Sequence, residues 1–384
     1  MSERAETPIE LAARIGAKVA PRSAEIEQNR TLPGDIVEDL AAAGLFKLFV
    51  PARYGGGEVS AADGLAVMEE IAAHDGSTGW CVMIAMTTGL IGGFLPADHA
   101  RAVYGSPDAI TGGFAAPMGR GKRVDGGISV RGRWQWGSGI AHCTAIGGGC
   151  VVHGGGPDGD ERPTAKFVLF DLGDVEILDT WYVAGLKGTG STDYQVHDAF
   201  VPEDRWFALA GAVPREDGPL YRFSFFGLLA LGVSAIALGL ARRSIDELIV
   251  LAATKRPQGS SRPLAERTPV QADVAIAEAS LRSARAFVAD AVGDAWTTVL
   301  AGDTVSDEQR RVIRLAATHA MSIGAQVVDR MYTAAGGVAV YEDSALQRVL
   351  RDVHVATQHA ITSSRTYELA GRLRLGLETD TAQL

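Results

Sequence analysis

The sequence predicts a mainly α-helical protein with a smaller β portion in the middle of the chain. The prediction rests on a change in the spacing of apolar residues. In the first third and again toward the C-terminus they recur at three and four residues, the period of amphipathic helices. Between them the apolar runs are short, β-branched or aromatic, and separated by Gly, Pro and Asp. We therefore expect an N-terminal helical domain at 1–108, a middle antiparallel β domain at 109–212 and a C-terminal four-helix bundle at 213–384.

The first third of the sequence predicts several helices joined by short loops. Leu11 and Ile15 lie four residues apart, which places them on one helical face. Ser60 stands just before another such pattern, and its hydroxyl can cap the first turn of a helix. A loop is expected at 75–79, ahead of an apolar helix that begins at Trp80.

The middle of the chain contains short segments that are typical of strands. One of them, ISVRGRWQW, follows an Asp-Gly pair, which favours a tight turn between strands. The segments expected to form strands are 128–136, 150–152, 166–170, 175–178 and 194–201. Trp134 and Trp136 are expected to face opposite sides of the sheet. Because short connections join the segments, we expect an antiparallel sheet.

Four long helical patterns follow the β region. They cover 219–255, 269–301, 307–335 and 343–376. Short connections separate them, which is typical of an antiparallel bundle. Residues 223–241 form a run of nineteen without a charge, close to the length of a membrane span. Charged residues at helical spacing follow this run and no second span accompanies it, so we expect a helix buried inside the bundle.

The composition argues against several classes of protein. With 384 residues, 47% of them hydrophobic and 21% charged, the chain has the composition of a globular enzyme. A net charge of −10 argues against nucleic acid or an anionic membrane as the main partner. The three cysteines lack the spacing of a disulfide framework or a zinc site, so we expect no metal and a reducing cytoplasm. The polar start MSERAETPIE lacks the apolar core of a signal peptide.

Residues 333–361 contain the motif that most directly indicates a binding site. Gly336 and Gly337 have no Cβ, so the backbone there can turn sharply and approach a phosphate or a ring closely. The helix that follows has one apolar face and carries Arg351 beside it. His359 lies eight residues further on, a little over two helical turns, and is expected to point in roughly the same direction. We interpret this stretch as the edge of a cofactor site.

The same stretch resembles the C-terminal signature of the acyl-CoA dehydrogenase superfamily: Gly-Gly, a short loop, a helix with Arg-Asp and, nine residues after that Arg, a catalytic glutamate. Ala360 occupies the glutamate position here, and the superfamily's alternative base would fall at 221–226, where YRFSFF has no carboxylate. Alanine cannot accept a proton, so the dehydrogenase reaction lacks its base. In the related flavin-dependent monooxygenases, which take reduced flavin from a separate reductase, a histidine stands at the position of His359.

Further segments resemble the same family. GRWQWGSG is similar to a strand that places a tryptophan beside the flavin and a hydroxyl at flavin N5, which would assign these roles to Trp136 and Ser138. The family's Thr-Glu-Pro flavin loop appears as Ala-Ala-Pro from Ala115, so only backbone donors remain there. Lys255 and Arg256 stand where the family has a cation at the cofactor's pyrophosphate. The resemblance covers nearly the whole chain and implies the acyl-CoA dehydrogenase fold and a homotetramer.

Each candidate residue also has a purely structural interpretation. Trp136 is alternatively a core tryptophan, and Ser138 a hydroxyl that satisfies its own turn. His359 is alternatively a hydrogen-bonded histidine of the bundle. Arg351 and the basic pair at 255, assigned to phosphates, are alternatively part of a solvated helix face.

The leading hypothesis is the oxygenase component of a two-component flavin monooxygenase. As the resemblance implies, reduced FAD or FMN would arrive from a partner flavin reductase and react with O2 to form a C4a-hydroperoxide. Ser138 would orient the flavin, and His359 would donate to the peroxide or deprotonate a substrate hydroxyl. The expected substrate is a hydrophobic small molecule: a phenol, a sterol-derived ring, or a sulfur or nitrogen heteroatom. The expected pocket walls are Phe223, Phe225, Phe226 and Trp80.

Two alternatives stay open at the level of sequence. One is an atypical acyl-CoA dehydrogenase that oxidises an acyl-CoA thioester with FAD and some other base. The other is a non-catalytic family member that serves as a binding or scaffold subunit.

Overall fold

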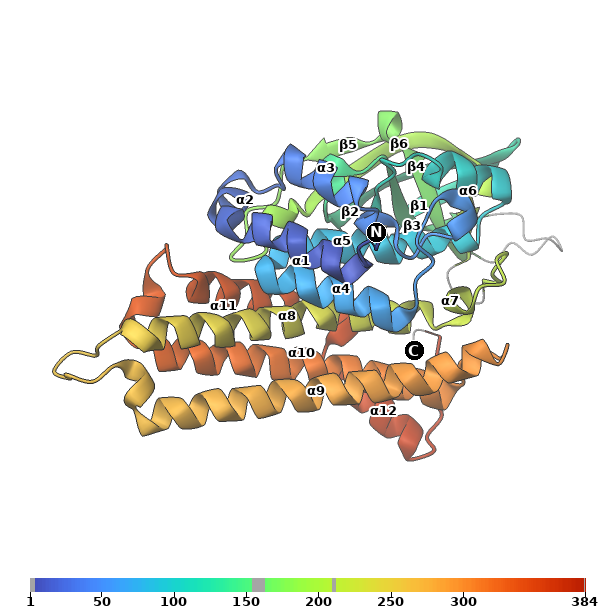
Figure 1. The fold of residues 1–384 in the computed structure, drawn as a ribbon. Coiled ribbons are helices and arrows are strands. Elements are labelled where there is room, and N and C mark those ends of the chain that lie inside the picture. Colours follow the sequence, from blue (N-terminus) through green and yellow to red (C-terminus); the bar gives the residue numbers. More distant parts are fainter. Residues whose placement is uncertain (1–3, 154–162, 209–211, 383) are drawn as a thin grey trace.

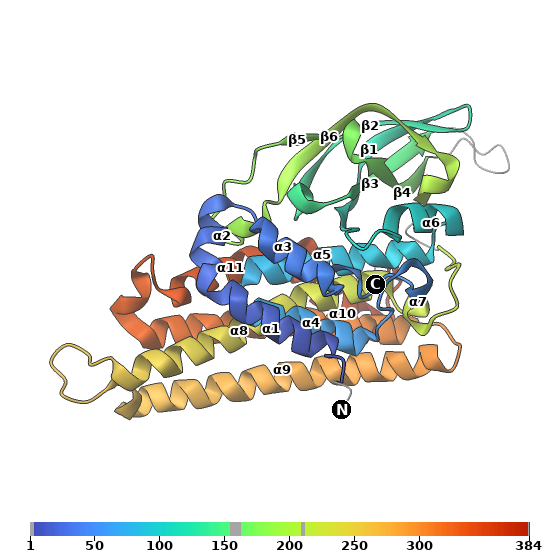
Figure 2. The same ribbon diagram turned by 45° about the horizontal axis from the view of Figure 1, so that its top comes forward.

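The architecture places a β-sheet beside a long helical bundle, with shorter helices packed against both (Figure 1). The computed structural model describes residues 4–153, 163–208, 212–382 and 384. A turned view shows helix α5 (Gly76–Gly89) between the sheet and the bundle (Figure 2). This helix contacts β1 (Thr111–Val124) on one side and α8 (Phe225–Thr254) on the other. The candidate site forms around α5.

The first third is helical, as predicted. Its α-helices are α1 (Pro8–Val19), α2 (Ser23–Asn29), α3 (Gly34–Ala42), α4 (Ala61–His74), α5 and α6 (Ala97–Tyr104). Ser60 caps α4 by accepting from Asp63 N at 3.1 Å, which confirms the predicted cap. The predicted loop at 75–79 is wrong, because α5 already begins at Gly76. Asp75 alone separates the two helices, and its carboxylate caps α5.

Within the described residues, the strands form a seven-stranded sheet in the order β5-β6-β2-β1-β3-β4-β7. The strands after β1 are β2 (Gly127–Gly137), β3 (Ala145–His153), β4 (Thr164–Asp171), β5 (Glu176–Leu178), β6 (Thr192–Pro202) and β7 (Trp206–Phe207). The expectation of antiparallel pairing is wrong at one pair, since β1 and β3 are parallel. The chain folds back along one side of β1 as β2 and then crosses to its other side, so β3 runs in the direction of β1.

The two neighbouring tryptophans of β2 differ sharply in exposure. Trp134 is fully buried, stacks on Tyr194 at 5.4 Å and donates from Nε1 to Gly149 O at 2.7 Å, whereas Trp136 is 51% exposed. Residues two apart on a regular strand share a face, so spacing alone would put both on one side. The register of β2 against β6 shifts between Trp134 and Gly137, and the φ of Trp136 is +62°. This bulge explains why the Trp136 ring is exposed, and the prediction that the two rings face opposite sides of the sheet stays a prediction.

The last third forms a helical bundle, as predicted. Its helices are α7 (Pro219–Arg222), α8, α9 (Thr268–Leu300), α10 (Asp307–Ala335), α11 (Ala345–Ala356) and α12 (Arg365–Arg374). The prediction of one helix over 343–376 is wrong, because α11 ends at Ala356 and a short 3-10 helix, η11 (Ala360–Thr362), follows. His359 stands at the start of η11 and caps it with its own ring.

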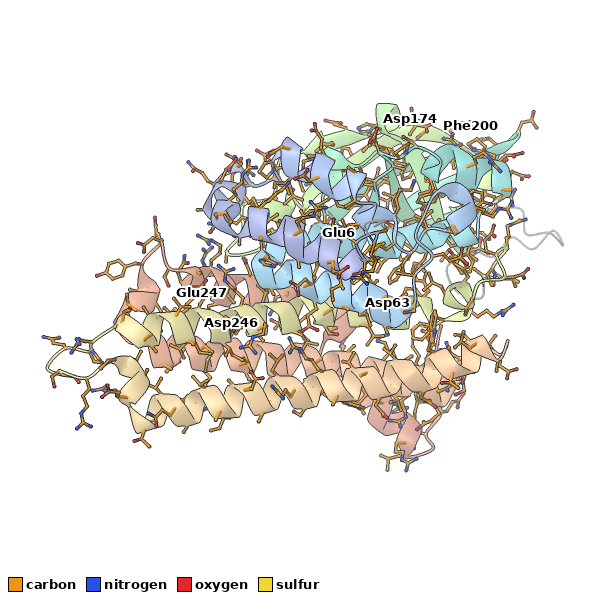
Figure 3. The ribbon with its side chains drawn as sticks, viewed as in Figure 1. Glu6, Asp63, Asp174, Phe200, Asp246 and Glu247 are labelled. Atoms are coloured by element: carbon orange, nitrogen blue, oxygen red, sulfur yellow. The ribbon has the colours of Figure 1, made fainter. Side chains whose placement is uncertain are left out.

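Helix α8 occupies the centre of the bundle. Among the described residues it is the one helix long and apolar enough to span a membrane, yet 78% of its apolar window is buried inside the fold. Its second half carries Asp246 and Glu247, which pair with Arg242 and Arg243 one turn earlier (Figure 3). The uncharged run at 223–241 is therefore the buried core helix that the sequence predicts.

Candidate functional site

Three of the residues singled out in the sequence meet beside α5. Trp80 on α5 donates from Nε1 to Ser138 Oγ at 3.0 Å, and Ser138 directly follows β2. The His359 ring lies 5.8 Å from the Trp80 ring and is tilted by 56°. Trp80 and Ser138 are both buried. The fold thus brings an indole, a hydroxyl and an imidazole together from three distant segments.

A chain of hydroxyl groups continues behind Ser138. Ser138 Oγ lies 2.7 Å from Ser191 Oγ, which lies 2.6 Å from Thr189 Oγ1. Thr189 Oγ1 donates to Leu186 O at 2.8 Å. All three hydroxyls are buried, so the hydrogen bonds among them replace those that water would otherwise make. We call Ser138, Ser191 and Thr189 the hydroxyl relay.

His359 is held at the break between α11 and η11. Ile361 N donates to His359 Nδ1 at 3.3 Å, and Arg314 Nη2 donates to Ile361 O at 2.7 Å. A ring nitrogen that accepts a hydrogen bond carries no proton, so the neutral ring carries its proton on Nε2. Burial of the ring, aided by the positive charge of Arg314, lowers the pKa of His359 to about 4. At neutral pH His359 is therefore an uncharged hydrogen-bond donor through Nε2.

The expectation that Arg351 and His359 point the same way is wrong. Helix α11 ends between them, so helical periodicity does not carry across. Arg351 binds the carboxylate of Glu27 on α2 at 2.5 and 3.0 Å, and Arg348 and Lys187 bind the same carboxylate. Arg351 thus joins α11 to α2, and its assignment to a phosphate stays a prediction.

Trp136 lies beside Phe114, edge-on, with ring centroids 5.3 Å apart. The register between β1 and β3 shifts on both sides of Pro117, so Ala115 and Ala116 leave the regular ladder. Such bulges often lie next to active sites because they free backbone groups from strand pairing. An exposed indole face beside unladdered backbone groups fits a flat ring with hydrogen-bonding edges, which is the character of a flavin.

The phenylalanines assigned to the pocket wall fall into two groups. Phe223 is buried and packs on Trp296 of α9 at 6.1 Å, so it faces the interior of the bundle. Phe225 and Phe226 begin α8, meet edge-on at 5.6 Å and are half-buried. Phe225 and Phe226 are thus the two whose rings remain partly accessible, and a role for them as pocket walls stays a prediction.

A small cavity beside Ser138 has a volume of about 10 Å³, enough for about one water molecule. Two polar residues that line it, Thr111 and His142, are bonded to neighbouring threonines at 2.8 and 3.0 Å. Apolar walls come from Leu32, Phe46, Ala85 and Ile110. Its polar groups already have partners in the protein, and a cavity of this size does not by itself hold an aromatic ring.

Lys255 and Gly336 meet near one end of the bundle. Lys255 Nζ donates to Ala335 O, where α10 ends, and Gly336 follows with a φ of +66°. Gly337 continues the turn, and Arg256 is exposed next to Lys255. The connection between α8 and α9 lies at the end of the bundle that the sheet does not cover (Figure 1). One chain therefore does not bring these residues to Trp136, near the end of β2, or to Ser138, which follows it, and their phosphate roles stay predictions.

Sequence reasoning missed three residues that organise the site. Thr189 and Ser191 lie in the Gly-rich segment GLKGTGSTDY, where hydroxyl residues are common for reasons of turn formation. Arg314 lies on the face of α10 that Ala317 and Met321 also occupy, and all three are buried. The position of Arg314, a charged residue on an otherwise apolar helix face, was the signal in the sequence that could have pointed to it.

The chain matches known family descriptions at both ends. "Acyl-CoA dehydrogenase, N-terminal domain" matches residues 9–95, and "Acyl-CoA dehydrogenase, C-terminal domain" matches 231–364. The indole-3-acetate monooxygenase of Pseudomonas putida is 33% identical over 362 residues, which are 94% of this chain and 92% of that protein. This chain belongs to the acyl-CoA dehydrogenase superfamily.

The chain's place within the superfamily follows from further relatives. The oxygenase subunit HsaA of a flavin-dependent monooxygenase from Rhodococcus jostii is 30% identical over 375 residues, covering 94% of this chain and 96% of that protein. The crystal structure of 3-HSA hydroxylase from Rhodococcus sp. RHA1 superposes with a TM-score of 0.91 at 26% identity, covering 98% and 99% of the two chains. This chain is thus the oxygenase component of a two-component flavin-dependent monooxygenase, a system that includes a reductase. Among the functions weighed from the sequence, the oxygenase hypothesis is confirmed.

More distant structures of the same fold contain flavins. XiaF from Streptomyces sp. holds FADH2 and glycerol, with a TM-score of 0.88 at 24% identity over 97% and 95% of the two chains. TdsC from Paenibacillus sp. A11-2 holds FMN and indole, with a TM-score of 0.82 at 19% identity over 98% of both. Both flavins expected from the sequence therefore occur in this fold.

Proposed function

We propose that this oxygenase uses reduced FAD or FMN to place one oxygen atom of O2 into a hydrophobic aromatic substrate. The observation that carries the proposal is the convergence of Trp80, Ser138 and His359. Trp136, the backbone at Ala115 and Ser138 would hold the flavin ring. When bound, the reduced flavin supplies two electrons to O2, so that one oxygen atom enters the substrate and the other leaves as water.

His359 acts in this proposal as a hydrogen-bond donor to the reacting oxygen. Its Nδ1 already accepts from Ile361 N, so Nε2 offers a proton and no lone pair. With its pKa at about 4, the ring is also a weak base at neutral pH. These features favour donation over deprotonation of a substrate hydroxyl, the other role considered from the sequence. Trp80 and the apolar walls beside Ser138 would keep water away from the reacting atoms.

An aromatic substrate is supported by the site and by the relatives. The side chains around Ser138 are mainly apolar, and the rings of Phe225 and Phe226 remain partly accessible. The Pseudomonas putida relative is named for indole-3-acetate, and a relative from Acinetobacter baumannii is named for p-hydroxyphenylacetate. Both are aromatic rings that carry a short acidic side chain. We propose a small ring compound of this class.

The homotetramer implied by the resemblance also belongs to the proposal. Lys255 and Gly336 meet at the end of the bundle that the sheet does not cover, whereas Trp136 and Ser138 belong to the segment around the end of β2. If the first pair contacts the phosphates of the same cofactor, a second copy of the chain has to supply it. A cytoplasmic location likewise stays a proposal, supported by three cysteines that are free and buried.

The experiment that tests the proposed function combines the protein with a flavin reductase, NADH, FAD or FMN and isotopically labelled O2. Indole-3-acetate and p-hydroxyphenylacetate serve as trial substrates, and mass spectrometry detects label in the product. We expect labelled product with the native protein and mainly hydrogen peroxide with His359→Ala. His354→Ala is the matched control, because His354 is exposed and pairs with Asp329 at 2.7 Å. Equal product yield from His359→Ala and His354→Ala would contradict the role given to His359.

A further inference from the structure

We propose that the hydroxyl relay fixes the direction of the Ser138 hydroxyl proton and thereby makes the site select reduced flavin over oxidised flavin. The inference rests on the proposed function, because it concerns the flavin that Ser138 would contact. It assigns the selectivity to Thr189 and Ser191, two residues that sit behind Ser138 in the relay.

The relay has one proton arrangement that satisfies every contact. Thr189 has a single hydroxyl proton, which it donates to Leu186 O. The 2.6 Å contact between Thr189 and Ser191 must then take its proton from Ser191. The 2.7 Å contact between Ser191 and Ser138 must in turn take its proton from Ser138. The reverse arrangement would place the bare oxygens of Thr189 and Leu186 against each other in a buried site, which is unfavourable.

Leu186 is fixed at the far end of the relay. Its backbone N donates to the buried carboxylate of Asp352 at 2.5 Å, and its carbonyl oxygen also accepts from Trp181 Nε1 at 3.1 Å. The φ of Leu186 is +50°, so this residue is held in a conformation that few side chains adopt freely. Leu186 O therefore stays in place as the acceptor that orders the relay.

Trp80 determines what remains available on Ser138. An indole Nε1 can only donate, so its 3.0 Å contact occupies one lone pair of Ser138 Oγ. The proton of Ser138 is already directed toward Ser191. One lone pair is left. Toward a ligand, Ser138 is therefore a hydrogen-bond acceptor and not a donor.

The N5 atom of a flavin changes its hydrogen-bonding character with redox state. Reduced flavin has a hydrogen on N5 and can donate to Ser138, whereas oxidised flavin has a bare N5 that can only accept. Contact with Ser138 is thus satisfied in the reduced state and sets two lone pairs against each other in the oxidised state. From this contact we expect reduced flavin to bind about tenfold more tightly or better, the size of effect that one unsatisfied buried hydrogen bond produces.

The test measures dissociation constants for oxidised and for reduced FMN and FAD under anaerobic conditions, without substrate or O2. The variants are Thr189→Val, which keeps the shape of the side chain, and Ser191→Ala. In either variant Ser138 is released from donating inward and can turn its proton toward N5. We expect oxidised flavin to bind more tightly, so that the preference for the reduced state falls by about fivefold or more.

Thr87→Val is the matched control. Thr87 is a buried threonine of α5 whose hydroxyl bonds to Met83 O and Ile84 O within its own helix. It should keep the native preference. An unchanged preference in both relay variants overturns the inference, as does equal weakening of both redox states. Equal binding of the two states by the native protein also overturns it but leaves the proposed function intact. Failure to bind flavin in either state would overturn both.

Discussion

Glu27→Gln should lower the free energy of unfolding by about 3 kcal/mol at pH 7. The carboxylate of Glu27 binds Arg351 at 2.5 and 3.0 Å, Arg348 at 3.0 Å and Lys187 at 3.1 Å. Its side chain is only 20% exposed. Glutamine keeps the size of the side chain but leaves three cations without their shared anion, and breaking a partly buried ion pair on one side is costly.

The magnitude follows from the pKa of Glu27. Burial alone would raise this pKa, but the hydrogen bonds and charges of Arg351, Lys187 and Arg348 outweigh burial and lower it from 4.5 to about 2. Such a lowering corresponds to about 3 kcal/mol of stability, because each pKa unit is worth about 1.4 kcal/mol. The folded-state pKa lies below the unfolded value. The stabilisation is therefore present above pH 4.5 and is lost as the pH falls toward 2.

Urea unfolding of the native protein and Glu27→Gln from pH 7 down to the acid limit measures this effect. The difference in the free energy of unfolding between the two proteins should be largest at neutral pH and should disappear as the pH falls below 4.5. Glu25→Gln is the control, because Glu25 lies on the same helix and pairs with Arg22 in contact with solvent. A loss of stability for Glu27→Gln no larger than for Glu25→Gln at pH 7 would refute the reasoning.

Two further predictions concern buried groups. Burial raises the pKa of Asp352 to about 7, so its stabilising contribution is complete below pH 3.8 and is lost as the pH rises through 7. Asp352→Asn should therefore raise the free energy of unfolding measured with urea at pH 8, by up to about 4 kcal/mol, and should not raise it at pH 4. An equal rise at both pH values would count against the raised pKa of Asp352. A Cβ at Gly16 would lie 2.2 Å from His74 Cδ2, whereas one at Gly34 would meet nothing within 4 Å. Gly16→Ala should cost about 1–3 kcal/mol and lower Tm, while Gly34→Ala should not; similar Tm values would contradict the packing described at Gly16.

The order of helices and strands was predictable because it depends on local periodicity. The uncharged run at 223–241 is the clearest case, since a soluble bundle has one place for a helix without polar faces, and that place is its centre. The strand Thr111–Val124 was not predicted, because its segment TGGFAAPMGRGKRV is rich in Gly, Ala and Pro, which are weak strand formers. This segment becomes a strand because it pairs with β2 and β3, and that pairing leaves no local pattern in the sequence.

The candidate site was predictable in part. Ser138 and His359 were found through resemblance, and the structure places both next to Trp80. The direction of His359 was not predictable from helical spacing, because the helix ends at Ala356 and the His359 ring instead caps the short 3-10 helix that follows. The relay residues Thr189 and Ser191 were not predictable either, since the contact of Ser191 with Ser138 joins segments 53 residues apart and leaves no periodic trace in the sequence.

The measurement that tests the central claim most directly is anaerobic mixing of the protein with reduced FAD or FMN, followed by O2, with absorbance recorded by stopped flow. If Ser138 and His359 hold the flavin and control its reaction with O2, the absorbance of oxidised flavin should return far more slowly than with free flavin, and His359→Ala should shorten the delay while His354→Ala leaves it unchanged. Return of the absorbance at the rate of free flavin would contradict the account.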